Sequence, residues 1–257
     1  MADDRYSQPV TVEGKRAVVV GGTSGIGRAI ALGFAEDGAD VVATSRREGA
    51  VAETAAELRE RGATTAEVTT DVTDADSVSG TLDAATDAMG GVDVLVNSAG
   101  AISRLGVPDV TEEEWDRVLD VQLDGVMRTT QAFGNAMDEG AVVNISSLSS
   151  RLAMTDIAAY TAAKGGVNAF TRTAAKEYAP DVRVNAIAPG YFITPQNADT
   201  YAEGTEKRER IDSRAMMERV GETEELIGAA VYLASDAAAY TTGEVLVVDG
   251  GFAVSAL

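Results

Sequence analysis

The chain has 257 residues, 45% of them hydrophobic, and its 41 acidic and 21 basic side chains give a formal net charge of −20. This length can bury a sizeable core in one large or two small domains. The charge opposes binding to nucleic acid or anionic lipid. With no Cys and no His, disulfides, thiolate nucleophiles and the commonest general base and metal ligands are excluded, so we expect no metal site.

The surface is expected to be acidic throughout, because acidic residues are spread along the chain and only four of the basic residues are Lys. Such a surface suits molar salt, where a Debye length of ~3 Å screens self-repulsion, and it predicts a halophilic source. No apolar run reaches the ~18 residues of a membrane span, and no signal-peptide core is visible. We therefore expect a cytoplasmic protein with no membrane partner and a flexible N-terminus at residues 1–10.

Short Val-rich runs alternate with stretches whose apolar residues recur at helical spacing. The runs predict buried strands at Arg16–Val20, Asp40–Ala43, Thr64–Thr69, Val92–Val96, Ala141–Ile145, Val182–Ile187 and Val245–Val248. The stretches between them predict helices at Ile26–Asp37, Gly49–Arg61, Ala75–Met89, Glu112–Met137, Ile157–Tyr178 and Thr223–Ser235. Because the connections are too long for hairpins, the fold class is α/β, a doubly wound parallel sheet of seven strands with helices on both faces. No domain boundary is visible, so we predict one domain over residues 1–257.

One polar stretch interrupts this alternation. Residues 196–219 carry many charged side chains and end in the apolar pair Met216–Met217. We expect residues 191–219 to form a small helical lid over a substrate site. From composition alone, a solvated surface helix is an equal alternative.

The first predicted strand runs into the sequence Gly21-Gly22-Thr23-Ser24-Gly25-Ile26-Gly27, and a helix begins there. Glycines let the backbone turn sharply and approach a pyrophosphate, while free N–H groups at the helix start stabilise its charge. Thr23 and Ser24 can add hydroxyl donors. The loop predicts dinucleotide binding, with an ordinary Gly-rich turn as the alternative.

The second predicted strand ends at Ser45-Arg46-Arg47. At this position an acidic residue favours NAD, whereas Arg favours NADP by pairing with the 2′-phosphate of the ribose. We therefore expect NADP to be preferred over NAD. Two solvated arginines at the start of a helix are the alternative.

Tyr160 and Lys164 are four residues apart, on one face of a predicted helix. A tyrosine acting as a base at neutral pH needs its pKa lowered from about 10 to about 7, and a Lys ammonium about 6 Å away supplies roughly two thirds of that change. Ser147 follows the fifth predicted strand, at the carboxyl edge where α/β sheets bind ligands. Its hydroxyl can polarise a carbonyl, so the three side chains predict a catalytic group. The alternative is a pair of residues on a helix surface.

Together these motifs resemble the short-chain dehydrogenase/reductase family over essentially the whole chain. The matching segments also include Asp71-Val72, Asn97-Ser98-Ala99-Gly100, Asn185-Ala186-Ile187-Ala188-Pro189-Gly190, Thr194 and Asp249-Gly250-Gly251. The resemblance implies a single-domain Rossmann fold and hydride transfer between a nicotinamide and a secondary alcohol or ketone. It also implies a homotetramer or dimer.

The resemblance assigns a role to each matching residue. Tyr160 would exchange a proton with the substrate oxygen, Ser147 would hydrogen-bond that oxygen, and Lys164 would lower the tyrosine pKa and hold the nicotinamide ribose. The expected cofactor-binding residues are Gly21, Thr23, Ser24, Gly25, Ile26, Gly27, Ser45, Arg46, Arg47, Asp71, Val72, Asn97, Ala99, Gly100, Tyr160, Lys164, Pro189, Gly190, Phe192 and Thr194.

Three positions depart from the family pattern. Val20 precedes the first glycine where Thr is usual, Ser98 replaces the second Asn of a usual pair, and Gln122 stands where the family carries an Asn. In the family that Asn supports a helix kink and a water that relays protons to the Lys. The extra methylene of Gln122 would displace the relay by about 1.5 Å, so we expect a modified relay in an active enzyme. In the alternative, Gln122 faces elsewhere.

Two local features resemble gluconate 5-dehydrogenases and 2-keto-3-deoxy-sugar-acid dehydrogenases. Arg104 follows the cofactor loop, and the segment Pro189–Gln196 opens the lid. A guanidinium can bind a substrate carboxylate bidentately, which favours a sugar acid. The expected substrate contacts are Arg104, Ser147, Ser149, Arg151, Tyr160 and Tyr191. For each arginine the alternative is a surface salt bridge.

Two other functions stay open. A 3-oxoacyl-thioester reductase would share nearly every motif, although the anionic surface should repel an acidic acyl carrier. An NADP-binding sensor with degraded catalysis is suggested by Gln122, and the intact Ser147, Tyr160 and Lys164 oppose it.

Overall fold

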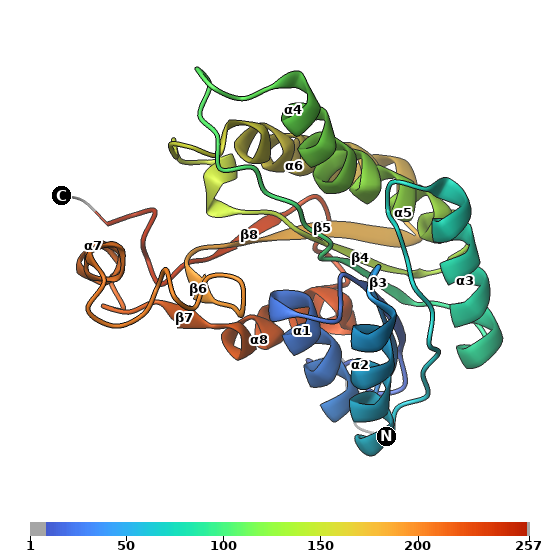
Figure 1. The fold of residues 1–257 in the computed structure, drawn as a ribbon. Helices are drawn as coiled ribbons and strands as arrows, with labels where there is room; N and C mark the ends of the chain where they lie inside the picture. Colours follow the sequence, from blue (N-terminus) through green and yellow to red (C-terminus); the bar gives the residue numbers. More distant parts are fainter. Residues whose placement is uncertain (1–8, 256–257) are drawn as a thin grey trace.

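The computed structural model describes residues 9–255. Six parallel strands form the main sheet in the order β2-β1-β3-β4-β5-β8 (Figure 1). Their bounds are β1 Arg16–Val20, β2 Asp40–Thr44, β3 Val94–Asn97, β4 Gly140–Ile145, β5 Val182–Pro189 and β8 Val245–Val248. The chain leaves β1 in one direction to form β2 and returns to its other side to form β3. This reversal opens a crevice at the carboxyl ends of β1 and β3, where ligands bind in doubly wound sheets.

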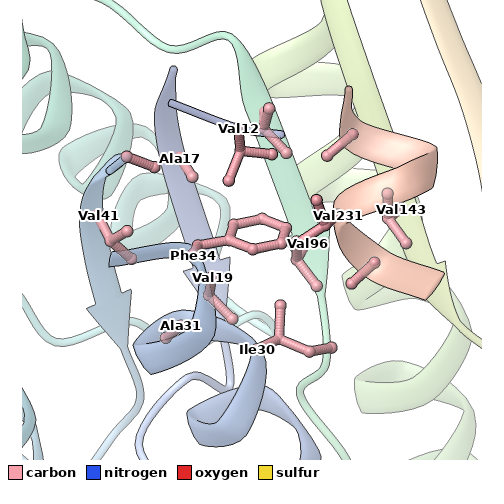
Figure 2. Packing of buried hydrophobic residues seen from close by; sticks show 14 of the residues in the cluster. Val12, Ala17, Val19, Ile30, Ala31, Phe34, Val41, Val96, Val143 and Val231 are labelled. Carbon is pink, nitrogen blue, oxygen red and sulfur yellow. The ribbon is translucent and has the colours of Figure 1, made fainter. Parts of the chain in front are cut away.

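The strands are buried on both faces because their apolar residues alternate between two cores. Ala17 and Val19 of β1 point to one side, and Val18 and Val20 point to the other. Figure 2 shows the first core, in which the Phe34 ring packs among Val19, Val96 and Val231. Since both faces are covered, the strands read in the sequence as continuous Val-rich runs rather than as alternating ones.

Helices cover both faces, as predicted (Figure 1). On one face lie α1 Gly25–Glu36, α2 Glu48–Glu60 and α8 Ile227–Ala234. On the other lie α3 Ala75–Met89, α4 Glu112–Leu119, α5 Gly125–Gly134 and α6 Ala158–Tyr178. The predicted single helix at Glu112–Met137 is interrupted, because a π-helical turn at Asp120–Asp124 joins α4 to α5. This turn carries Gln122 into the interior, where it is 2% exposed.

The prediction of seven strands was wrong by one. Thr64–Thr69 runs beside β2 without forming a strand, and only an isolated bridge joins Thr69 to Ser45. Side chains take part of its hydrogen bonding: Asp40 accepts from the Thr64 backbone N–H, and the Thr44 hydroxyl donates to the carbonyl of Val68. Among the described residues, only the Val41 N–H, which donates to the carbonyl of Thr64, and the Thr70 N–H, which donates to that of Ser45, make backbone bonds along the segment.

The lid region contains more structure than the predicted helix. It holds α7 Glu206–Arg214, and its first strand, β6 Phe192–Ile193, pairs with β7 Gly221–Glu222 just beyond residue 219. Of the flexible segment expected at residues 1–10, all but the last two residues lie outside the described part of the chain. Within residues 9–255, no helix is long and apolar enough to cross a membrane.

Candidate active site

A cavity of about 1140 Å³ lies at the crevice between the ends of β1 and β3 and continues beneath the lid. Of the residues predicted from sequence, it brings together Gly21, Thr23, Ser24, Gly25, Ile26, Ser45, Arg46, Arg47, Asp71, Val72, Ala99, Gly100, Arg104, Gln122, Ser147, Tyr160, Lys164, Pro189, Gly190, Tyr191, Phe192 and Thr194. Gly27, Asn97, Ser149 and Arg151 do not line it. The site therefore gathers segments from nearly the whole chain on one edge of the sheet.

The glycine loop can hold a pyrophosphate because it leaves backbone donors free. Gly21 has a φ of +80°, and a Cβ there would lie 2.5 Å from the backbone nitrogen of Ala99, so only glycine fits. At the start of α1, Ser24 makes no capping hydrogen bond through its side chain, and the first turn has no acidic residue. These first N–H groups and the positive end of the helix suit an anion.

Gly27 and Asn97 shape the site from beneath. A Cβ at Gly27 would lie 2.3 Å from the carbonyl oxygen of Gly21, so Gly27 allows the helix to approach the loop. The buried Asn97 amide donates to Asn144 Oδ1 at 2.9 Å, and its oxygen accepts from the Thr129 hydroxyl at 2.7 Å. These bonds fix the end of β3, from which Ala99 and Gly100 reach the cavity.

The expected adenosine end lies beside Ser45, whose Oγ accepts a hydrogen bond from the Thr23 hydroxyl at 2.8 Å. Arg46 and Arg47 are exposed on the cavity wall, and within residues 9–255 neither forms an ion pair. The pKa of Asp71 is lowered, chiefly by the hydrogen bond from the Thr73 backbone and also by the charge of Arg46. The two guanidinium groups are thus accessible to an anionic ligand.

Ser147 and Tyr160 both line the cavity. Ser147 follows β4, and its Oγ accepts hydrogen bonds from the backbone N–H of Ser149 at 3.1 Å and from the Ser149 hydroxyl at 3.0 Å. The Tyr160 hydroxyl is near enough to Ser147 for this side chain to lower its pKa. Ser149, predicted as a substrate contact, is 2% exposed and instead orients Ser147.

Lys164 lies one helical turn beyond Tyr160 and is 4% exposed. Its Nζ donates to the carbonyl of Ile145 at 2.6 Å and lies 5.6 Å from the centre of the Tyr160 ring. Burial lowers the pKa of Lys164 to about 7. Burial also raises the pKa of Tyr160, against the opposing hydrogen bond with Ser147. Burial is thus the larger influence on Tyr160 in the protein alone, and the expected lowering of its pKa by Lys164 stays a prediction.

The π-helical turn aims Gln122 at the loop after β3. Its Nε2 donates to the carbonyl of Ala101 at 2.7 Å, and its buried Oε1 has no hydrogen-bond partner in the described part of the chain. No hydrogen bond between described residues joins Gln122 to Lys164. The side chain thus reaches the cavity wall, and its expected place in a proton relay stays a prediction.

Another part of the cavity wall is formed by the lid region, residues 191–219, and by the loop after β3. Arg104 is exposed on this wall, whereas Arg151 is exposed outside the cavity. Several further residues that were not predicted from the sequence also line the cavity, among them Ser98, Asp156, Gln196, Tyr201 and Lys207. The lid carries three of these, and its polar composition gave no signal of which side chains face inward. Gln196 also hydrogen-bonds Ser24 at 3.3 Å, which joins the lid to the glycine loop.

The parallel sheet, the glycine loop at its switch point and the grouped Ser, Tyr and Lys define a nicotinamide-dependent oxidoreductase. A family model described as Enoyl-(Acyl carrier protein) reductase matches residues 20–253. The chain belongs to the short-chain dehydrogenase/reductase family, and it is an NAD(P)-dependent alcohol dehydrogenase or ketoreductase. The predicted family is thereby confirmed.

Relatives with different substrates share this architecture. The chain is 40% identical over 247 residues to 3beta-hydroxysteroid dehydrogenase 1 of Eggerthella lenta, covering 93% of this chain and 94% of the relative. It is 35% identical over 249 residues to gluconate 5-dehydrogenase of Gluconobacter oxydans, covering 95% of this chain and 97% of the relative. A crystal structure of a gluconate 5-dehydrogenase from Burkholderia cenocepacia, in complex with NADP and tartrate, superposes on this chain with a TM-score of 0.91 at 33% identity. The superposition covers 96% of this chain and 98% of that chain.

Replacing Tyr160 by Phe removes the hydroxyl that meets Ser147. Because proton transfer by a positioned side chain contributes roughly 10²–10⁴-fold to a rate, we expect turnover to fall by at least about a hundredfold while cofactor affinity changes little. Steady-state assays and fluorescence titration with NADPH measure the two quantities. Turnover within tenfold of the unmodified protein would contradict the assignment of Tyr160 as the proton donor and acceptor.

Replacing Lys164 by Met should stabilise the fold at neutral and acidic pH. Below about pH 7 the native protein holds a buried ammonium, and between pH 7 and 10.5 only the unfolded chain keeps that proton, so native stability rises with pH. We expect Lys164→Met to raise the free energy of unfolding by about 1–2 kcal/mol at pH 6, with the difference narrowing towards pH 10. Urea unfolding at both pH values measures this, and Lys176→Met, at an exposed position on the same helix, serves as the control. If the free energy of unfolding of Lys164→Met differed from that of the unmodified protein by the same amount at both pH values, Lys164 would not titrate near neutrality.

Proposed function

We propose that the protein is an NADP-preferring dehydrogenase of a sugar acid, gluconate or a 2-keto-3-deoxy sugar acid, acting on a secondary alcohol or ketone group. The observation that carries the proposal is the charge of the cavity wall. Five basic side chains line the cavity, namely Arg46, Arg47, Arg104, Lys164 and Lys207, against two acidic ones, Asp71 and Asp156. In the whole chain acidic side chains outnumber basic ones 41 to 21. The cavity is therefore selectively cationic and suited to anionic ligands.

The proposed mechanism uses the central group. The nicotinamide supplies or accepts the hydride. The Ser147 hydroxyl hydrogen-bonds the substrate oxygen, and Tyr160 removes its proton in oxidation or returns one in reduction. Lys164, held by the carbonyl of Ile145, would hold the nicotinamide ribose. The positive charge of protonated Lys164 favours the tyrosinate, against the burial that opposes it.

The substrate end supports a hydroxylated acid over a steroid. Arg104, Lys207, Asn197 and Asp156 give this part of the wall several polar and charged side chains, whereas a steroid requires mostly apolar walls. Relatives named as gluconate 5-dehydrogenases, one of them in complex with the hydroxy acid tartrate, agree with this preference. Arg104 is the residue that we expect to bind the carboxylate, because its guanidinium can form a bidentate pair.

Replacing Arg46 by Ala tests the cofactor preference. If its guanidinium pairs with the 2′-phosphate, the KM for NADP⁺ should rise by about tenfold or more and the KM for NAD⁺ should stay within about twofold. Steady-state kinetics with each cofactor measure this, and Arg172→Ala, at an exposed position on α6 and outside the cavity, is the control. Equal increases for the two cofactors would contradict 2′-phosphate recognition by Arg46.

Replacing Arg104 by Ala tests the substrate class. We assay NADP⁺ reduction with aldonates and 2-keto-3-deoxy acids, in dilute buffer and in molar KCl, beside reduction of a 3-oxoacyl thioester. Loss of the carboxylate pair should raise the KM for the sugar acid by about tenfold, because charge-assisted hydrogen bonds contribute roughly 1.5–3 kcal/mol. Arg151→Ala, outside the cavity, is the matched control. Turnover of the thioester alone would overturn the sugar-acid proposal, and cofactor binding without any turnover would favour a sensor.

A further inference from the structure

We propose that Lys207, on the lid helix α7, is a second specificity-determining residue that binds the substrate carboxylate together with Arg104. The inference rests on the proposed function and deepens it, because it states how a carboxylate is recognised from two sides of the cavity. Arg104 belongs to the loop after β3, whereas Lys207 belongs to the lid. The two cations therefore come from separate elements that face the same space.

Tyr201 lies beside Lys207 and within the electrostatic reach of Arg104. The Nζ of Lys207 lies 5.4 Å from the centre of the Tyr201 ring. Arg104 is close enough for its charge to oppose the rise in the pKa of the Tyr201 hydroxyl. Burial nevertheless raises that pKa to about 12. Tyr201 therefore remains a neutral phenol and places no negative charge where the carboxylate would lie.

The ring of Tyr201 is held in place by its neighbours. It packs edge-on against Tyr191 with ring centres 5.8 Å apart, and Tyr191 packs against Phe252 at 4.9 Å. Arg208 donates to the carbonyl of Tyr201 at 3.1 Å, which ties α7 to the segment before it. Because both ends of this segment are fixed, Lys207 is presented to the cavity from a defined position.

Lys207 differs from the neighbouring cations of α7. Arg208 pairs with Asp212 at 2.8 Å and Arg210 pairs with Glu206 at 2.6 Å, whereas Lys207 forms no ion pair with any residue from 9 to 255. Acidic residues are abundant in this segment, so a lysine kept apart from them and turned to the cavity is available to an external anion. Two of the four lysines in the chain, Lys164 and Lys207, line the cavity.

The test compares two variants, each of which removes one positive charge from α7, at Lys207 in the first and at Arg210 in the second. Lys207→Met keeps much of the aliphatic stem over Tyr201 and removes the ammonium, while Arg210→Met removes an equal charge from the exposed, already paired position. Lys207→Arg restores the charge. Each variant is assayed with NADP⁺ and a sugar acid, and with a neutral polyol of the same carbon skeleton, in dilute buffer and in molar KCl.

We expect Lys207→Met to raise the KM for the acid by about tenfold at low salt, with kcat within about twofold and the KM for the polyol unchanged. Lys207→Arg should stay within about threefold of the unmodified protein, and molar KCl should reduce the effect of Lys207→Met because salt screens the exposed ammonium. The Arg210→Met control should change neither KM.

The outcomes separate the two proposals. If the unmodified protein oxidises the acid and Lys207→Met changes its KM no more than Arg210→Met does, the role of Lys207 is overturned and the sugar-acid function stands. An equal rise in KM for the acid and the polyol would assign Lys207 to lid structure and would also overturn the inference. If the unmodified protein turns over only the polyol or a thioester, the proposed function fails and the inference fails with it.

Discussion

The close approach of two loops at the switch point of the sheet is the constraint on which the site depends. Gly21 follows β1 and lies against the backbone of Ser98 and Ala99, which follow β3. A side chain at Gly21 would clash with this backbone and push apart the ends of β1 and β3. The crevice lies at these two strand ends, because the chain leaves β1 towards β2 on one side and returns to form β3 on the other. Gly25, which lies near Thr194 and Gln196 of the lid, and Gly100, which lies near Gln122, border the same cavity.

The polar groups beneath the crevice are held by a core that would be more stable without some of them. Lys164 is buried with the backbone carbonyl of Ile145 as its hydrogen-bond acceptor, and no carboxylate pairs with it among the described residues. Asn97 and Asn144, by contrast, share a completed network of amide and hydroxyl partners. A buried hydrogen-bond network in which every polar group has a partner costs little folding free energy. The buried amine of Lys164, which has no carboxylate partner among the described residues, destabilises the fold, and its burial lowers its pKa to about 7. The same burial therefore destabilises the fold and tunes the site.

Sequence reasoning located most of the sheet because buried parallel strands are continuous apolar runs, and it located the glycine loop and the Ser147, Tyr160 and Lys164 group because their spacing is set locally. It was wrong at Thr64–Thr69, whose Val and Thr residues suit a strand while side chains of β2 take its hydrogen bonds. It could not place Ser149 or Arg151, because one residue in a short helical turn decides whether a side chain faces the cavity. Tyr201 and Lys207 were missed for a related reason, since the lid folds through contacts between distant segments and has no apolar periodicity of its own.

The charge distribution links the cavity to the rest of the surface. A protein with a net charge of −20 repels anions at long range, yet its cavity wall carries an excess of basic groups. At low salt these opposing fields act together, so an anionic substrate meets a repulsive surface before it reaches an attractive site. In molar salt the Debye length of ~3 Å removes the long-range repulsion, while contacts at hydrogen-bonding distance inside the cavity persist. Salt should therefore favour the entry of an anionic ligand, such as the nicotinamide cofactor, more than it weakens binding inside the cavity.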